Sequence, residues 1–212
     1  MKYKISYQFR WLLVIGLILA FFLSSLILIK LPFFSLRYEE KEVTGNILDL
    51  LLSFFPTLTV EFQAYNLQTI LIWSSGILFG SRLSLIAVLI YLFIGLCGVP
   101  IFAGGGGIDY FHEPTFGYVI SLPLLTYLSG YFFSKDKKIQ SVLFPILAVH
   151  LLGIIYLFIF KQSHLSIAWT LSFSMIGYDL FFAFLLIPIL PVLSFILNEM
   201  FIQEIPVREL PS

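Results

Sequence analysis

Long apolar runs separated by short polar breaks dominate this sequence. A helix of roughly 20 apolar residues crosses the hydrocarbon core of a bilayer. Polar breaks fall at Gly80-Ser-Arg82 and at Lys135-Asp-Lys-Lys138, where tight turns between helices are expected. The pattern predicts an all-α membrane protein with six transmembrane helices, at about residues 11–29, 67–80, 83–100, 116–133, 139–160 and 177–197.

Two segments interrupt this pattern within what we expect to be a single membrane domain over residues 1–212. Residues 30–63 form a mixed outer loop, and within it the short apolar run Asn46–Phe55 suggests an interfacial helix. Residues 161–176 are only moderately apolar and are expected to form a re-entrant or surface segment. Pro188 and Pro191 fall inside the predicted last helix, where neighbouring helices can compensate for the lost backbone hydrogen bonds.

Composition supports lipid as the solvent of this chain. Hydrophobic residues make up 59% and charged residues 11%, whereas soluble domains carry about a quarter charged residues. The net charge of zero gives no electrostatic basis for binding nucleic acid. The positive-inside rule places both termini in the cytoplasm, because that side then receives most of the basic residues: Lys2, Lys4, Arg10, Arg82, Lys135, Lys137, Lys138 and Arg208.

Several chemistries have no support in the sequence. It contains no Gly-x-x-x-x-Gly-Lys-Ser/Thr phosphate loop and no paired histidine ligands or serine nucleophile elbow. The single cysteine, Cys97, excludes an internal disulfide and a Cys-His metal cluster. We therefore expect no enzyme activity, no metal and no cofactor, and uphill transport would need an ion gradient or a partner.

A glycine-rich segment between two predicted helices is the first candidate site. Gly104, Gly105, Gly106 and Gly107 stand in a row at the outer mouth of the bundle. Glycines allow backbone N–H groups to approach a ligand closely and to form an anion-accepting nest. The alternative is a plain flexible connector.

Two ionisable residues within apolar helices form the second candidate. Asp179 lies near the start of the last predicted helix, where it could cap the helix or accept N–H groups of a ligand such as a cyclic urea. His150 lies in the fifth predicted helix, either satisfied within the core or contacting a ligand.

Small residues four positions apart mark one face of the first predicted helix. Gly16, Ala20 and Ser24 would let another helix approach closely. The neighbour could be a helix of this chain or an external partner.

Several short motifs, taken in their order along the chain, resemble the BioY family. Its members are the biotin-specific substrate-binding (S) components of energy-coupling-factor (ECF) transporters. Two of these motifs are the longest. They are Gly98-Val-Pro-Ile-Phe-Ala-Gly-Gly105 and Pro114-Thr-Phe-Gly-Tyr118, preceded by Leu67-Gln-Thr69, Gly80-x-Arg82 and the segment Tyr91–Gly95. The resemblance covers about residues 64–130 well. It implies a six-helix S-component bundle in the bacterial cell membrane that binds biotin with high affinity. Its partners would be a transmembrane coupling protein and two cytoplasmic ATPases.

The resemblance also implies roles for particular residues. Asp179 would accept the ureido N–H groups, with the bicyclic ring packed on Tyr118 and Tyr156 and the glycine loop facing the carboxylate. The ligand-binding residues that we expect from all these patterns are Gly104, Gly105, Gly106, Gly107, Thr115, Tyr118, His150, Tyr156 and Asp179, and the expected partner face is Gly16, Ala20 and Ser24.

The chain departs from the family pattern at one position, because Phe182 stands where a lysine usually follows the aspartate by three residues. Three alternatives to biotin binding remain open at this point: an S component for a related vitamin, a membrane enzyme acting on lipids, and an assembly factor for another membrane complex.

Overall fold

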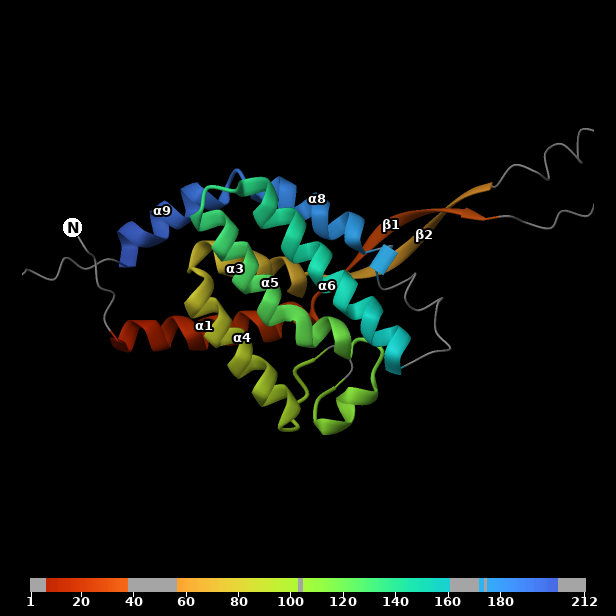
Figure 1. The fold of residues 1–212 in the computed structure, drawn as a ribbon, viewed down its shortest axis with the longest axis horizontal. Coiled ribbons are helices and arrows are strands. Elements are labelled where there is room, and N and C mark those ends of the chain that lie inside the picture. Colours follow the sequence, from red (N-terminus) through yellow and green to blue (C-terminus); the bar gives the residue numbers. More distant parts are fainter. Residues whose placement is uncertain (1–6, 38–56, 103–104, 161–171, 174, 202–212) are drawn as a thin grey trace, which may run out of the picture. The chain divides into compact units, whose positions relative to one another are not determined.

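The computed structural model describes residues 7–37, 57–102, 105–160, 172–173, 175 and 176–201. This part of the chain is mostly helical (Figure 1). The helices are α1 (Tyr7–Leu26), α3 (Gln68–Leu78), α4 (Ser81–Leu96), α5 (Phe116–Ser134), α6 (Lys138–Phe160), α8 (Ile176–Leu186) and α9 (Leu190–Phe201), with a short 3-10 helix η1 (Ile108–His112). Two strands, β1 (Leu28–Arg37) and β2 (Thr57–Asn66), complete the described elements.

Helix α3 lies at the centre of the bundle and contacts α1, α4, α5, α8 and α9. Its Trp73 is fully buried, and the indole Nε1 donates a hydrogen bond to the Ser141 carbonyl of α6 over 2.7 Å. Gly76 faces α5 so closely that a Cβ there would overlap the Thr126 carbonyl oxygen. Small residues thus let these helices cross tightly, as membrane helix packing requires.

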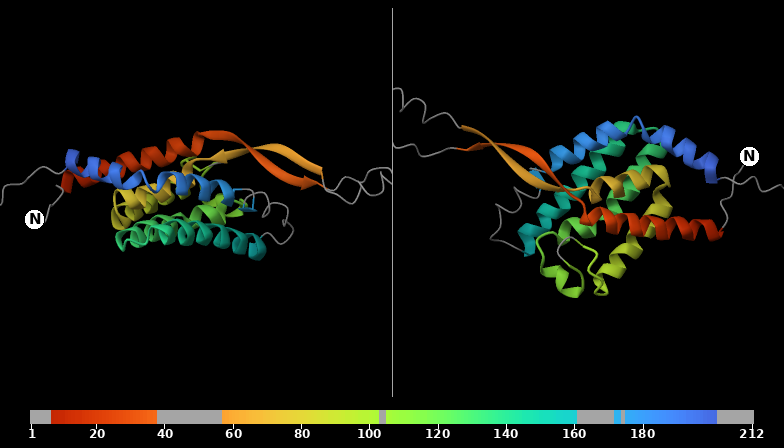
Figure 2. Two further views of the ribbon diagram at one scale, coloured as in Figure 1. Left: turned by 90° about the horizontal axis from the view of Figure 1, so that it is seen from above. Right: turned by 180° about the vertical axis from the view of Figure 1, so that it is seen from behind.

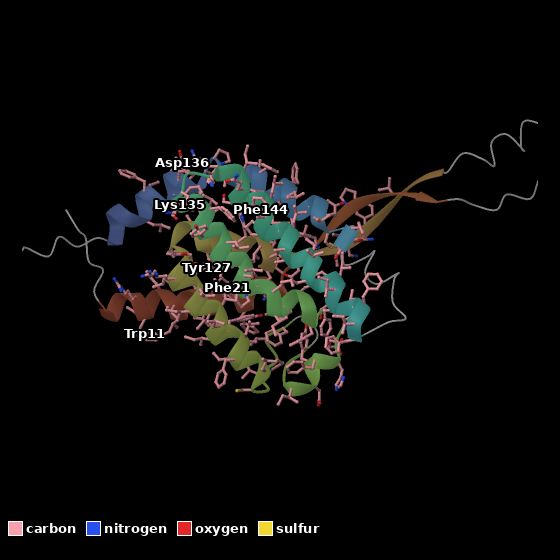
Figure 3. The ribbon with its side chains drawn as sticks, in the orientation of Figure 1. Trp11, Phe21, Tyr127, Lys135, Asp136 and Phe144 are labelled. Atoms are coloured by element: carbon pink, nitrogen blue, oxygen red, sulfur yellow. The ribbon has the colours of Figure 1, made fainter. Side chains whose placement is uncertain are left out.

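Helices α5 and α6 run side by side, joined by a short turn at Lys135 and Asp136 (Figures 2 and 3). Among the described residues they are the two helices individually long and apolar enough to cross a membrane. Large apolar side chains, including Tyr127 of α5 and Phe144 of α6 (Figure 3), are exposed on their outer faces. Such surfaces suit lipid rather than water, so the chain is a membrane protein.

The predicted last helix is wrong as a single straight span. Residues 177–197 fall in two helices, α8 and α9, whose axes bend by 58° at the break. Pro188 lies in this break and Pro191 in the first turn of α9. Proline removes a backbone donor and clashes with the preceding turn, which favours a break at this point. The pair counts as a third candidate span only when taken together.

The other predicted helices lie where expected, with ends that differ by a few residues. Helices α1, α3 and α4 are apolar, but their described portions are shorter than a full crossing. The count of six transmembrane helices is therefore a prediction beyond the two or three that length and composition identify in the described residues.

Two strands lie at the two ends of the outer loop predicted at residues 30–63, so the fold is not purely α-helical. Strands β1 and β2 pair antiparallel from Leu28 opposite Asn66 to Arg37 opposite Thr57. The β-branched and aromatic residues of Thr57–Asn66 alternate with polar ones, which favours a strand. Residues 28–66 form a compact unit separate from the helical one. The predicted interfacial helix Asn46–Phe55 lies outside the described residues, as does nearly all of the predicted segment 161–176.

Candidate functional site

The two predicted intramembrane ionisable residues meet inside the helical unit. Asp179 occupies the first turn of α8, and its Oδ2 lies 2.9 Å from Nε2 of His150 in α6. Only 3% of Asp179 and 5% of His150 is exposed. A carboxylate in the first turn also interacts favourably with the helix dipole. The structure therefore brings a buried acid and imidazole together from residues 29 positions apart.

Tyr118 of α5 lies beside this pair. Its ring meets the His150 ring edge-on, with centroids 6.1 Å apart, and its hydroxyl is 2.6 Å from Oγ of Ser172. Gly153, one turn beyond His150 in α6, makes room for the Tyr118 ring, since a Cβ at this position would overlap it. Three elements thus place an aromatic ring, an imidazole and a carboxylate in one neighbourhood.

Tyr156 lies one turn further along α6. Its side chain packs against Gly117 of α5, where a Cβ would overlap it, and its hydroxyl donates to the Phe111 carbonyl. The Phe116 ring lies 5.5 Å away between centroids. Tyr156 therefore fastens the segment before α5 to α6 and lies within an aromatic cluster.

Thr115 contributes to the same segment. Its Oγ1 is 2.8 Å from the hydroxyl of Tyr110 in η1. Burial raises the pKa of Tyr110, while its hydrogen bond with Thr115 acts in the opposite direction. Thr115 is thus engaged with η1 rather than with the Asp179–His150 pair.

The glycine-rich segment folds back onto the end of α4. The backbone N–H of Gly107 donates to the Gly95 carbonyl over 2.7 Å. Phe102 and Gly105 exchange both of their backbone hydrogen bonds. A Cβ at Gly106 would overlap the Val99 carbonyl. These contacts use the N–H groups of two of the four glycines, so those two do not form the expected anion nest; Gly104 lies outside the described residues.

A buried polar network, to which the sequence patterns assigned no role, supports this loop. Gln68 of α3 donates to the Tyr91 hydroxyl of α4 over 2.8 Å, and that hydroxyl donates to the Ile101 carbonyl over 2.7 Å. The same carbonyl accepts a hydrogen bond from Ser25 of α1 over 3.0 Å. Gln68 lies in the Leu67-Gln-Thr69 motif. A glutamine at the start of an apolar helix was therefore the signal in the sequence that could have indicated this network.

The predicted partner face on α1 divides between surface and interior. Gly16 is exposed, and a Cβ there would meet no atom within 4 Å. Ala20 is half-buried, whereas Ser24 is buried and donates to the Phe21 carbonyl. The described residues contain no group of three or more potential metal ligands.

Comparisons with known proteins point in one direction. The BioY family model matches residues 47–199. A probable biotin transporter BioY of Lysinibacillus sphaericus is 31% identical over 114 residues, which cover 54% of this chain and 57% of that protein. A probable biotin transporter BioY of Pyrococcus horikoshii is 35% identical over 93 residues, which cover 43% of this chain and 57% of that protein. The chain thus spans less than two thirds of the length of these relatives.

One solved structure shares the fold. It is the S-component for biotin from an ECF-type ABC transporter, with a TM-score of 0.62 and 18% sequence identity. The superposition covers 94% of this chain and 100% of that one. At this identity the likeness establishes an S-component-like fold.

Proposed function

We propose, given that this chain belongs to the BioY family, that it is the membrane-embedded subunit that captures biotin for a vitamin importer. The observation that carries the proposal is the buried Asp179–His150 pair beside Tyr118. A carboxylate buried within apolar membrane helices is costly, and ionisable residues in that setting mark binding or transport sites. Pairing with His150 offsets part of this cost and fixes the position of the carboxylate.

The chemistry of biotin suits such a site. Its cyclic urea carries N–H donors, and a carboxylate can accept about four hydrogen bonds on its two oxygens. In this proposal Asp179 accepts from the ureido group, while Tyr118 and Tyr156 supply aromatic surface for the bicyclic ring. Ligand sites of this kind are mostly apolar, with a few polar groups that fix orientation.

The loop and η1 shape the mouth of the proposed site. Gly105, Gly106 and Gly107 let the backbone lie close against the end of α4, and Thr115 holds Tyr110 beside them. In this proposal Gly105, Gly106 and Gly107 shape the outer mouth above the ligand. No bond is made or broken at the site, so the subunit is not an enzyme.

The proposal extends to topology and partners. Six crossings require α1, α3, α4 and the bent α8–α9 pair to span in addition to α5 and α6, with both termini in the cytoplasm of a bacterial cell. The sequence has no phosphate loop, so the energy would come from two cytoplasmic ATPases through a transmembrane coupling protein. The exposed surface at Gly16, on the helix face that also carries the half-buried Ala20 and the buried Ser24, is where that coupling protein would contact α1.

Calorimetric titration of the detergent-purified full chain with biotin tests this proposal. The wild type is expected to bind near one equivalent, and D179A is expected to lose binding. D179N keeps the side-chain volume and an acceptor for His150, and we expect at least tenfold weaker binding, which corresponds to about 1.4 kcal/mol.

D136N is the matched control for the loss of a carboxylate. Asp136 is exposed in the turn between α5 and α6, and its φ of 58° suits asparagine equally well. Affinity unchanged by D136N and reduced by D179N supports the site. Absence of biotin binding by the folded wild type would contradict the proposal that this chain binds biotin. Binding of another vitamin instead would change the proposed ligand class.

A further inference from the structure

The imidazole of His150 has one ring nitrogen that the described structure does not use. Nε2 is engaged with Asp179, whereas Nδ1 is buried and has no hydrogen-bond partner. Leaving a buried polar group unpaired is unfavourable. Native structures rarely keep such a group without a functional reason.

The ring is fixed in place on two sides. Asp179 of α8 engages one nitrogen, and the Tyr118 ring of α5 packs edge-on against the imidazole. Gly153 admits the Tyr118 ring to this position. The imidazole is thus held in place by groups from α5 and α8, which fixes the position of Nδ1 as well.

The carboxylate determines which nitrogen carries the proton. When Asp179 is ionised it only accepts hydrogen bonds, and the nitrogen that faces it, Nε2, is then the donor. In the neutral ring Nδ1 is then an acceptor. Asp179 and Nδ1 are therefore two acceptors on the two nitrogen-bearing sides of one imidazole.

We infer that Nδ1 of His150 accepts a hydrogen bond from an N–H group of the bound ligand and makes the site specific for a ligand with two such donors. This inference rests on the proposed function, with the cyclic urea of biotin as the ligand. One ureido N–H binds Asp179 and the other binds His150. The histidine thereby supplies a polar ligand contact in a chain that has Phe182 instead of the lysine of the family pattern.

Two substitutions of His150 separate the roles of the two ring nitrogens. The Gln amide reaches the position of Nε2, so H150Q keeps a donor to Asp179 and removes the acceptor at Nδ1. Calorimetry with the full chain is expected to show at least tenfold weaker biotin binding by H150Q, with an unfolding midpoint near that of the wild type. H150F removes both nitrogens and is expected to lower the midpoint as well, because Asp179 then lacks its imidazole partner.

A biotin derivative methylated on one ureido nitrogen tests the ligand side. Of the two possible derivatives, one is methylated on the nitrogen that faces His150, and the wild type is expected to bind it at least tenfold more weakly than biotin. For H150Q, the difference in affinity between that derivative and biotin is expected to be smaller. H150Q that binds biotin as tightly as the wild type overturns the inference. Failure of the wild type to bind biotin overturns the proposed function instead, so the two results are distinguishable.

A measurement on the wild type covers the case in which H150Q does not fold. The chain has three histidines, and in ¹⁵N-histidine-labelled protein the resonances that persist in both H112Q and H164Q belong to His150. Biotin is expected to shift the Nδ1 resonance of His150 in the direction of an accepted hydrogen bond. An Nδ1 resonance unchanged at saturating biotin contradicts the inference.

Discussion

The ring of Phe102 occupies the space that a side chain at Gly95 would need. Gly95 lies near the end of α4, and a Cβ built there would overlap the phenyl ring. Phe102 is buried and also packs edge-on against Tyr91, with ring centroids 5.6 Å apart. The missing side chain at position 95 therefore seats the glycine-rich loop on α4.

G95A is expected to destabilise the protein by about 1–3 kcal/mol, because overpacking moves a buried ring off its position. The unfolding midpoint in detergent measures this effect. G16A is the matched control, since a Cβ at Gly16 meets nothing within 4 Å. An exposed helical glycine gains about 0.5–1 kcal/mol on change to alanine. Equal midpoints for the two variants would contradict the seating of the loop at Gly95.

The hydrogen bond from Trp73 to the Ser141 carbonyl joins α3 to α6. W73F removes the donor and some buried volume. Hydrogen bonds between membrane helices contribute about 0.6 kcal/mol on average and up to about 1.7, and the lost volume adds to this. We expect a total loss of about 1–3 kcal/mol, measured by denaturant titration in detergent. W11F, at an exposed tryptophan, is expected to lose less.

The helices could be predicted from the lengths of the apolar runs, but the break in the last one could not be placed. Pro188 and Pro191 are visible in the sequence, and prolines occur both in continuous and in broken membrane helices. Which outcome occurs depends on whether neighbouring helices satisfy the freed carbonyls. That information is tertiary, and here the chain bends by 58°.

The β1–β2 hairpin and the Asp179–His150 pair show two different limits of prediction from the sequence. Alternation in Thr57–Asn66 was a readable strand signal, which the overall helical character of the chain obscured. Asp179 and His150 were both identifiable as ionisable residues in apolar helices. Their pairing depends on the rotation of α6 and α8 about their axes, which helices with apolar residues on all sides do not reveal.

The phenol of Tyr110 makes the stability of the protein depend on pH at pH values above the ordinary pKa of tyrosine. Burial raises its pKa in the folded protein, whereas in the unfolded chain it ionises near about 10. Above that pH the unfolded state binds fewer protons, so the free energy of unfolding falls as pH rises through the folded-state pKa. Below about pH 10 this group adds no pH dependence.

Y110F is therefore expected to show a shallower loss of stability above about pH 10 than the wild type. It also lacks the hydrogen bond to Thr115, so its stability at neutral pH is expected to be lower by about 0.5–1.5 kcal/mol. Unfolding midpoints across the alkaline range measure both effects. Y127F, at an exposed tyrosine of α5, is the control, and identical alkaline slopes for Y110F and wild type contradict the prediction.

Gly153 connects helix packing to the proposed ligand site. A Cβ at this position would overlap the Tyr118 ring, and that ring packs against His150. G153A must therefore displace Tyr118, the α5–α6 contact, or both. Since Tyr118 is proposed to carry the bicyclic ring of biotin, we expect G153A to weaken biotin binding by roughly tenfold or more, equivalent to about 1.4 kcal/mol.

G177A is the matched control for G153A. Gly177 lies in α8 two residues before Asp179, yet a Cβ there meets nothing within 4 Å. We expect G177A to bind biotin as the wild type does, because it adds the same methyl group without moving a neighbour. Calorimetry on both folded variants makes the comparison. Equal affinities for G153A and wild type would place the ligand away from Tyr118, and weaker binding by G177A alone would place it against the exposed start of α8.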